Sequence, residues 1–200
     1  MIPARENPFS TNRVLRERYR LAENEWGPLL EKLNYHCGRG ALVGHKGSGK
    51  TTLLEDLMVR LARPGRRMTL IRLSAESPRM PAVFTPGFFA KLDANDAVLL
   101  DGAEQLSLFA WFRFRRATRH AGIVIVTTHR ANRLPLLHRC TTTPHLLQEL
   151  VSSLGVELTP DEAGSLHQRH RGNIREAIRE LYDRFAEKID PELSRRSSLV

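Results

Sequence analysis

The chain has 200 residues and a formal net charge of +9 at pH 7; 41% of its residues are hydrophobic and 26% are charged. These proportions are typical of a globular chain. No apolar run approaches the roughly 20 residues of a membrane helix, and residues 1–13 lack the apolar core of a signal peptide. We therefore expect no membrane insertion and a cytoplasmic location.

The positive charge comes mainly from arginine, which outnumbers lysine several-fold. Arginine pairs with phosphate in a bidentate manner and stacks on bases. A strongly basic chain therefore favours a polyanionic partner such as nucleic acid. The alternative is that the arginines reflect a GC-rich genome and lie on solvated helix faces.

Along the chain, residues 1–36 are predicted to form a polar arm followed by a short helix. Apolar runs then predict strands, and amphipathic segments between them predict helices, one over 51–63 and one over about 103–120. The strands are expected at 39–43, 68–73, 97–101, 122–128 and, more weakly, 136–142. This alternation predicts an α/β fold over residues 37–143, with about five parallel strands between two helical layers.

Residues 144–188 are predicted to form a small helical annex. A capping box begins one of its helices, because Thr159 is followed by Pro160 and Glu162. A last helix places Ile174 and other apolar residues at helical spacing. The tail, residues 189–200, is predicted to be disordered.

The strongest local pattern is "GHKGSGKT", residues 44–51, which matches G-x-x-x-x-G-K-[ST] between an apolar strand and an amphipathic helix. Glycines let backbone N–H groups curl around a phosphate, and the helix N-terminus adds unpaired donors. Lys50 is expected to reach the β- and γ-phosphates and Thr51 to ligate magnesium. The predicted nucleotide-binding residues are Gly44, His45, Lys46, Gly47, Ser48, Gly49, Lys50, Thr51 and Thr52.

An aspartate ends the apolar strand predicted at 97–101. Ligands of doubly wound sheets lie at the carboxyl ends of the strands, so Asp101 is predicted to hold magnesium together with Thr51. The alternative is that Asp101 caps the helix that follows.

The residue after Asp101 is a glycine, and the next acid is Glu104. Glu104 is predicted to orient the attacking water on the first turn of a helix. It has an alternative role as the third-position acid of a capping box with Asp101. Gln105 is a further candidate for holding the water.

Polar residues also end the strand predicted at 122–128. Thr127 or Thr128 is expected to sense the γ-phosphate, and His129 is either a second candidate or a loop histidine. Arg130 and Arg133 either reach a neighbouring subunit's nucleotide or are solvated.

Two arginine-containing segments have both a functional and a plain interpretation. Arg175, in the first turn of the last helix, is either a γ-phosphate sensor or a surface residue. The segment "WFRFRRATRH", residues 111–120, either stacks on and neutralises a nucleic-acid strand or packs its aromatic residues on the sheet.

The motifs "GHKGSGKTT", "AVLLDGAEQL", "VIVTTHR" and "GNIREAIRELY" occur in this order over residues 37–187. Together they resemble P-loop ATPases of the AAA+ and STAND type, with a NACHT-like Walker B segment. The resemblance implies a P-loop NTPase three-layer sandwich, with the sensor strand between the two Walker strands, and a helical lid over 144–188. It assigns Lys50 and Thr51 to Walker A, Asp101 to Walker B, Thr127 or Thr128 to sensor 1, and Arg175 to sensor 2.

The sequence therefore predicts a switch that binds ATP and Mg²⁺ and hydrolyses ATP slowly, with Lys50, Glu104, Thr127 and Arg175 as catalytic residues. Oligomerisation and a nucleic-acid or protein partner are compatible with it. The alternatives are a nucleic-acid-binding module gated by ATP without significant turnover, an ABC-like ATPase and a small-molecule kinase. No guanine-recognition motif of the N-K-x-D type is present, which favours ATP over GTP.

Overall fold

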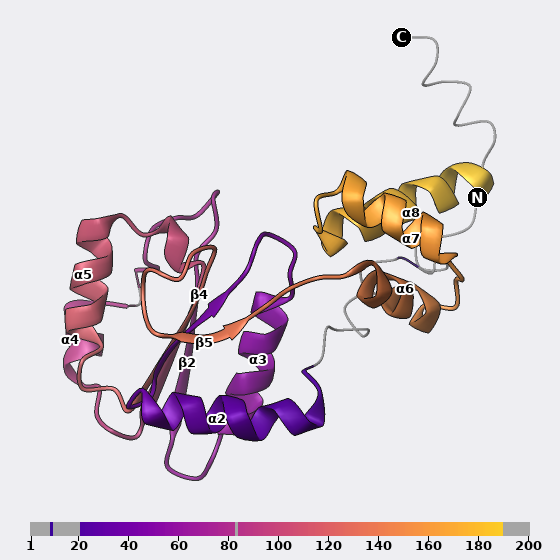
Figure 1. Cartoon of the computed structure of the whole chain (residues 1–200). Helices are drawn as coiled ribbons and strands as arrows, with labels where there is room; N and C mark the ends of the chain where they lie inside the picture. The colour runs from indigo at the N-terminus through magenta and orange to yellow at the C-terminus, as the bar shows by residue number, and fades with distance from the viewer. Residues whose placement is uncertain (1–8, 10–20, 83, 190–200) are drawn as a thin grey trace. The chain divides into compact units, whose positions relative to one another are not determined.

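The computed structural model describes Phe9, residues 21–82 and residues 84–189 (Figure 1). Most of the predicted N-terminal arm and nearly all of the predicted tail lie outside these residues. The chain divides into two compact units. We call Arg20–His45 with Gly49–Cys140 the core unit, and Lys46–Ser48 with Thr141–Val200 and Met1–Tyr19 the C-terminal unit. The domain boundaries predicted from the sequence stay a prediction.

The core unit contains one five-stranded sheet in which every pair of neighbouring strands is parallel. The prediction of an α/β chain with about five parallel strands is therefore confirmed. The sheet order is β2-β3-β4-β1-β5, which places β4 between β1 and β3. The strands are β1 (Arg39–Val43), β2 (Arg67–Arg72), β3 (Asp96–Asp101), β4 (Ile123–Thr128) and β5 (Leu136–Arg139).

Helices cover both faces of the sheet, which explains why the central strands are apolar throughout. Successive residues point to opposite faces, so Leu99 packs in one buried cluster whereas Val98 and Leu100 pack in the other. The short helix η2 (Glu23–Glu25) precedes α2 (Trp26–Tyr35). Leu29 and Leu33 of α2 and Leu53, Leu54 and Leu57 of α3 (Lys50–Leu61) fill the first cluster. Helices α4 (Pro86–Ala90) and α5 (Leu108–Ala117) contribute to the second cluster, and Figure 1 shows α3 and α5 on opposite faces.

The helix predicted over about 103–120 is wrong as a single element. A 3₁₀ helix, η3, covers only Ala103–Gln105, and α5 begins at Leu108. Leu106 between them has extended backbone angles. The Ser107 hydroxyl then accepts a hydrogen bond from the Ala110 N–H at 3.2 Å, which makes Ser107 the true N-cap of α5.

The C-terminal unit contains three helices among the described residues, namely α6 (Pro144–Ser153), α7 (Pro160–Arg169) and α8 (Ile174–Ile189). The capping box predicted at the start of α7 is confirmed, because Thr159 and Glu162 bond each other's backbone N–H groups. Ile174, Ile178 and Leu181 of α8 are buried against α6 and α7 in a separate apolar cluster. None of the helices in the described part of the chain is long and apolar enough to cross a bilayer.

Candidate functional site

The glycine-rich segment 44–49 connects β1 to α3, as the motif predicts. Gly47 and Gly49 have φ angles of +76° and +83°, a left-handed conformation that side chains with a Cβ rarely adopt. Gly49 is the N-cap residue of α3, and no side chain caps this helix end. Its first-turn N–H groups are therefore available to an anion.

The lysine that follows this loop has a buried side chain. Lys50 is only 8% exposed, and its Nζ donates a hydrogen bond to the His45 carbonyl oxygen at 2.6 Å. The Ser48 side chain is also buried, and its Oγ has no hydrogen-bond partner within the described residues. A buried hydroxyl without a partner is costly in a folded chain, so this loop offers polar groups that a ligand can satisfy.

Asp101 lies at the centre of a hydrogen-bond network at the carboxyl ends of β3 and β4. The Thr51 hydroxyl, at the start of α3, donates to Asp101 Oδ2 at 2.9 Å. The Thr127 hydroxyl donates to Asp101 Oδ1 at 2.6 Å and accepts the Gly102 N–H at 2.8 Å. The structure thus brings together Thr51, Asp101 and Thr127, three of the residues predicted from the sequence.

This network also separates the two threonines that the sequence leaves as alternatives. Both Thr127 and Thr128 are buried, but only the Thr127 hydroxyl is bonded to Asp101. Thr127 is therefore placed to orient the carboxylate, while its predicted contact with the γ-phosphate stays a prediction.

The backbone at Gly102 explains why no acid directly follows Asp101. Gly102 has a φ of +85°, and a Cβ at this position would lie 2.4 Å from the Leu73 carbonyl oxygen. That separation is far below van der Waals contact, so a glutamate at residue 102 cannot be accommodated without moving the chain after β2. The next acid along the chain in this turn is Glu104.

Glu104 projects from η3 and is 23% exposed. Its Oε1 lies 3.3 Å from His129 Nε2, whereas its Oε2 is buried without a hydrogen-bond partner in the described structure. The alternative role in a capping box with Asp101 is wrong, because Ser107 caps α5 and no side chain caps η3.

His129 is a functional candidate that the sequence left open, since a histidine at a strand end is often only a loop residue. In the structure it directly follows β4 and faces Glu104, with 44% of its side chain exposed. The pairing depends on the order of β3 and β4 in the sheet. A histidine one residue beyond the predicted sensor position was the only signal for it in the sequence.

The remaining predicted residues are placed as follows. Thr52 is the third residue of α3 and is half-buried, and Gln105 ends η3. Arg133 makes its contacts within the core unit. Its Nη2 donates to the Leu106 carbonyl oxygen at 2.7 Å, and its guanidinium lies over the Trp111 ring. Arg175 is exposed at the start of α8 in the C-terminal unit. Its role as a sensor stays a prediction.

The donor set around Asp101 suits a cation shared with a phosphate ligand. Within residues 21–82 and 84–189, no Lys, Arg or His forms an ion pair with Asp101, and no three His, Cys, Asp or Glu side chains cluster as a metal cage. Mg²⁺ is usually held by one or two protein oxygens together with substrate phosphates rather than by a protein cage. Asp101 and Thr51 fit that pattern.

Comparison with known proteins adds no assignment, since no protein-family model and no curated protein matches this chain. The functional interpretation therefore rests on the residues at the carboxyl ends of β1, β3 and β4. This edge of the sheet combines a left-handed glycine loop, a buried lysine, and an aspartate that accepts two hydroxyl hydrogen bonds. It also has the carboxylate of Glu104, one oxygen of which has no hydrogen-bond partner among the described residues. This combination can bind a phosphate chain with a divalent cation and hold a water molecule.

Proposed function

We propose that this chain is a P-loop ATPase of the AAA+/STAND type that binds MgATP and hydrolyses it slowly as a molecular switch. The observation that carries the proposal is the hydrogen bond from Thr51, at the end of the glycine loop, to Asp101 at the end of β3. This hydrogen bond links the predicted phosphate-binding loop to the predicted cation-binding aspartate. The strand order, with β4 between β1 and β3, also supports it.

In this proposal the loop receives the phosphate chain on its backbone N–H groups and on the N-terminus of α3. Lys50 exchanges the His45 carbonyl oxygen for the β- and γ-phosphates. Thr51 donates its only proton to Asp101, so its oxygen lone pairs remain for the cation. When bound, Mg²⁺ neutralises charge that develops on the phosphate oxygens.

Glu104 is the proposed water-orienting residue. One carboxylate oxygen faces His129 and the other has no hydrogen-bond partner among the described residues, so the second is free to accept a hydrogen bond from water. Thr127 keeps Asp101 and the Gly102 turn in place. Because Gly102 shifts the acid to residue 104, we expect turnover to be slow.

Two measurements test this function on the purified full chain: MgATP affinity by titration calorimetry, and phosphate release in single-turnover assays. Lys50→Ala is expected to weaken MgATP binding by roughly tenfold or more, whereas Lys32→Ala on the exposed part of α2 leaves it unchanged. Glu104→Gln is expected to slow phosphate release by about 100-fold with binding retained, whereas Glu31→Gln, also on α2, has no effect.

The outcomes separate the parts of the proposal. Absence of MgATP binding by the wild-type chain contradicts the function as a whole. Binding with equal phosphate release in wild type and Glu104→Gln contradicts only the role of Glu104 and leaves a nucleotide clamp. Arg175→Ala in the same assays tests the predicted sensor of the C-terminal unit, and an unchanged rate contradicts that role.

A further inference from the structure

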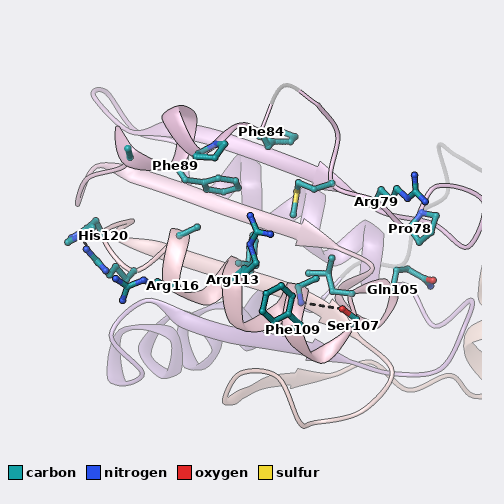
Figure 2. A pocket seen from close by; sticks show the side chains of 18 residues that line it. Pro78, Arg79, Phe84, Phe89, Gln105, Ser107, Phe109, Arg113, Arg116 and His120 are labelled. Atoms are coloured by element: carbon teal, nitrogen blue, oxygen red, sulfur yellow. Dashed lines mark hydrogen bonds between the residues drawn. The ribbon is translucent and has the colours of Figure 1, made fainter.

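A large cavity lies in the core unit and is lined by helix α5, by residues 78–80 and 84–90, and by residues 105–107 after β3 (Figure 2). Its volume is about 840 Å³, which is within the range of small-ligand and peptide sites. Its interior is apolar and is formed by Met80, Phe84, Phe89 and Leu106, among others. Nothing in the proposed nucleotide site uses this cavity.

Arginines surround the apolar interior. Arg79, Arg113, Arg116 and Arg119 line the cavity, and no acidic residue does. None of the four forms an ion pair with a carboxylate in the described part of the chain, whereas Arg60, Arg67 and Arg72 elsewhere in the core unit all do. The cavity therefore has a positive rim without negative partners, which is complementary to an anionic ligand.

The apolar surface continues outside the cavity along α5. Leu108, Phe109 and Phe112 are 71%, 72% and 63% exposed. Large apolar side chains that gather on one exposed helix face are typical of a protein-binding surface. Figure 2 shows Arg79 with Pro78 at one end of the cavity, Arg116 with His120 at the other, and Phe84, Phe89 and Phe109 between them. The surface is thus elongated, with charge along its length.

We propose that this surface binds an amphipathic, acidic helix of a partner protein. Apolar side chains of that helix fill the cavity and cover Leu108, Phe109 and Phe112, and its carboxylates pair with the rim arginines. A fatty acid has one carboxylate and would leave most of the rim unpaired. A nucleic acid supplies phosphates but no aliphatic groups to fill the cavity. A second copy of this chain, with its own net charge of +9, is repelled by the same rim.

If the proposed ATPase function holds, binding of a helix in this cavity is expected to affect ATP hydrolysis, because of where the cavity lies. Gln105, Leu106 and Ser107 line the cavity and directly follow Glu104 in the chain. A bound helix therefore contacts the segment that fixes the water-orienting acid. We expect occupancy to change the rate of phosphate release, and binding itself to be measurable without nucleotide.

The test uses the full chain and a fluorescein-labelled helical peptide of about 18 residues, with leucines on one face and glutamates on the other. Fluorescence anisotropy is expected to show saturable binding, and a peptide with lysine in place of glutamate is expected not to bind. Arg113→Glu and Phe109→Ser are each expected to weaken binding roughly tenfold. Arg63→Glu is the matched control, because Arg63 is exposed just after α3, on the other face of the sheet, and does not line the cavity.

Circular dichroism melting of each variant confirms that it is folded, and Arg116→Glu repeats the test at a second rim position. Equal weakening by Arg113→Glu and Arg63→Glu overturns the proposal, since it shows attraction to net charge alone. Absence of binding by the wild-type chain also overturns it. Single-stranded DNA is tested as a competitor of the peptide. If DNA displaces the peptide, and if Arg113→Glu weakens DNA binding while Phe109→Ser leaves it unchanged, the surface is a nucleic-acid site and the proposal is overturned. Unchanged peptide binding in Lys50→Ala keeps this result separate from the nucleotide site.

Discussion

Strand β3 has an aspartate at each end, and the two have opposite surroundings. Asp96, at the amino end, is 3% exposed and accepts two hydrogen bonds from the Arg67 guanidinium, at 2.6 and 2.7 Å. It also accepts the Asp93 N–H at 2.6 Å. Asp101, at the carboxyl end, accepts hydrogen bonds only from the neutral hydroxyls of Thr51 and Thr127 within the part of the chain that the structure describes.

The difference separates a carboxylate that is paired within the fold from the carboxylate that the proposed function uses. The Arg67 guanidinium, through its hydrogen bonds, holds the pKa of Asp96 below the ordinary value of 3.8. The charge of Asp96 is thus compensated within the fold. Asp101 is held by two hydrogen bonds, but it forms no ion pair with a protein cation among the described residues. We therefore expect a variant at residue 96 to lose stability and a variant at residue 101 to lose activity.

The largest effect is expected from Asp101→Asn. The amide can still accept one hydroxyl, so the fold is kept, but the negative charge that attracts the cation is removed. Phosphate release from MgATP is expected to fall by about 100- to 1,000-fold. Asp96→Asn, measured in the same assay at low temperature, is expected to stay within a few-fold of wild type, and equal losses would show that the two ends of β3 do not differ in function.

The turn after Asp101 fixes the backbone at this end of β3, because Gly102 lies close to the Leu73 carbonyl oxygen. Gly102→Ala places a methyl group against the Leu73 carbonyl oxygen and is expected to lower the free energy of unfolding by about 2–4 kcal/mol. Gly65→Ala is the control, since Gly65 has a φ of +79° with nothing within 4 Å of a Cβ. Its expected cost is about 1 kcal/mol, by urea denaturation. Similar losses in both variants would refute the close contact with Leu73.

A smaller effect is expected from Asp96→Ala, which removes a buried acceptor of the Arg67 and Asp93 hydrogen bonds. The free energy of unfolding is expected to decrease by about 1–3 kcal/mol. Calorimetric melting measures this change, and Asp161→Ala on the exposed start of α7 is a control for loss of a surface carboxylate. MgATP affinity of the folded Asp96→Ala variant is expected to match wild type.

The smallest effect is a pH dependence. Because the pKa of Asp96 is lowered by folding, its contribution to stability is fully present above the ordinary carboxyl pKa. It is lost as the pH falls through that value towards the folded pKa. Urea denaturation at a series of pH values is expected to show wild type and Asp96→Asn converging in stability below about pH 4. A stability difference that stays constant down to about pH 2.5 would contradict the assignment.

The parts of the core predicted most closely are the strands buried on both faces. The apolar runs at 97–101 and 122–128 differ by only one residue from β3 and β4, because a doubly covered strand requires unbroken apolar side chains. The capping box at Thr159 was equally readable, since both of its hydrogen bonds are local. Residue patterns alone did not give the order of the strands, which came from the family resemblance.

The region after Asp101 could not be predicted as well. Ala103, Leu106, Ala110 and Phe114 recur at helical spacing, so the segment looked continuous. The left-handed turn at Gly102 lies against the Leu73 carbonyl oxygen, a tertiary contact that no local pattern records. Ser107 before an apolar run was an available cap signal for the true start of α5. The contact between Glu104 and His129 joins residues from two elements. Such a contact depends on strand order and register, which no local pattern records.

The cavity beside α5 also could not be predicted from the sequence. Residues 74–95 have little periodicity, and only Thr85 followed by Pro86 marked the short helix α4. The arginines of α5 were visible in the sequence, but whether they face acids, water or an apolar hollow depends on this irregular segment folding over the helix. Its amino-acid composition does not determine that path.

The position of β1 in the sheet has a consequence for how the protein is made. Both neighbours of β1, β4 and β5, are encoded about 80 to 100 residues later in the chain. During synthesis, the segment carrying the glycine loop leaves the ribosome well before the strands that flank β1 exist. The loop is therefore expected to be held in place only after residues 123–139 have emerged, so formation of the proposed phosphate-binding loop is expected to be a late step of folding. A nascent chain that ends before β4 has no completed loop to recognise a nucleotide.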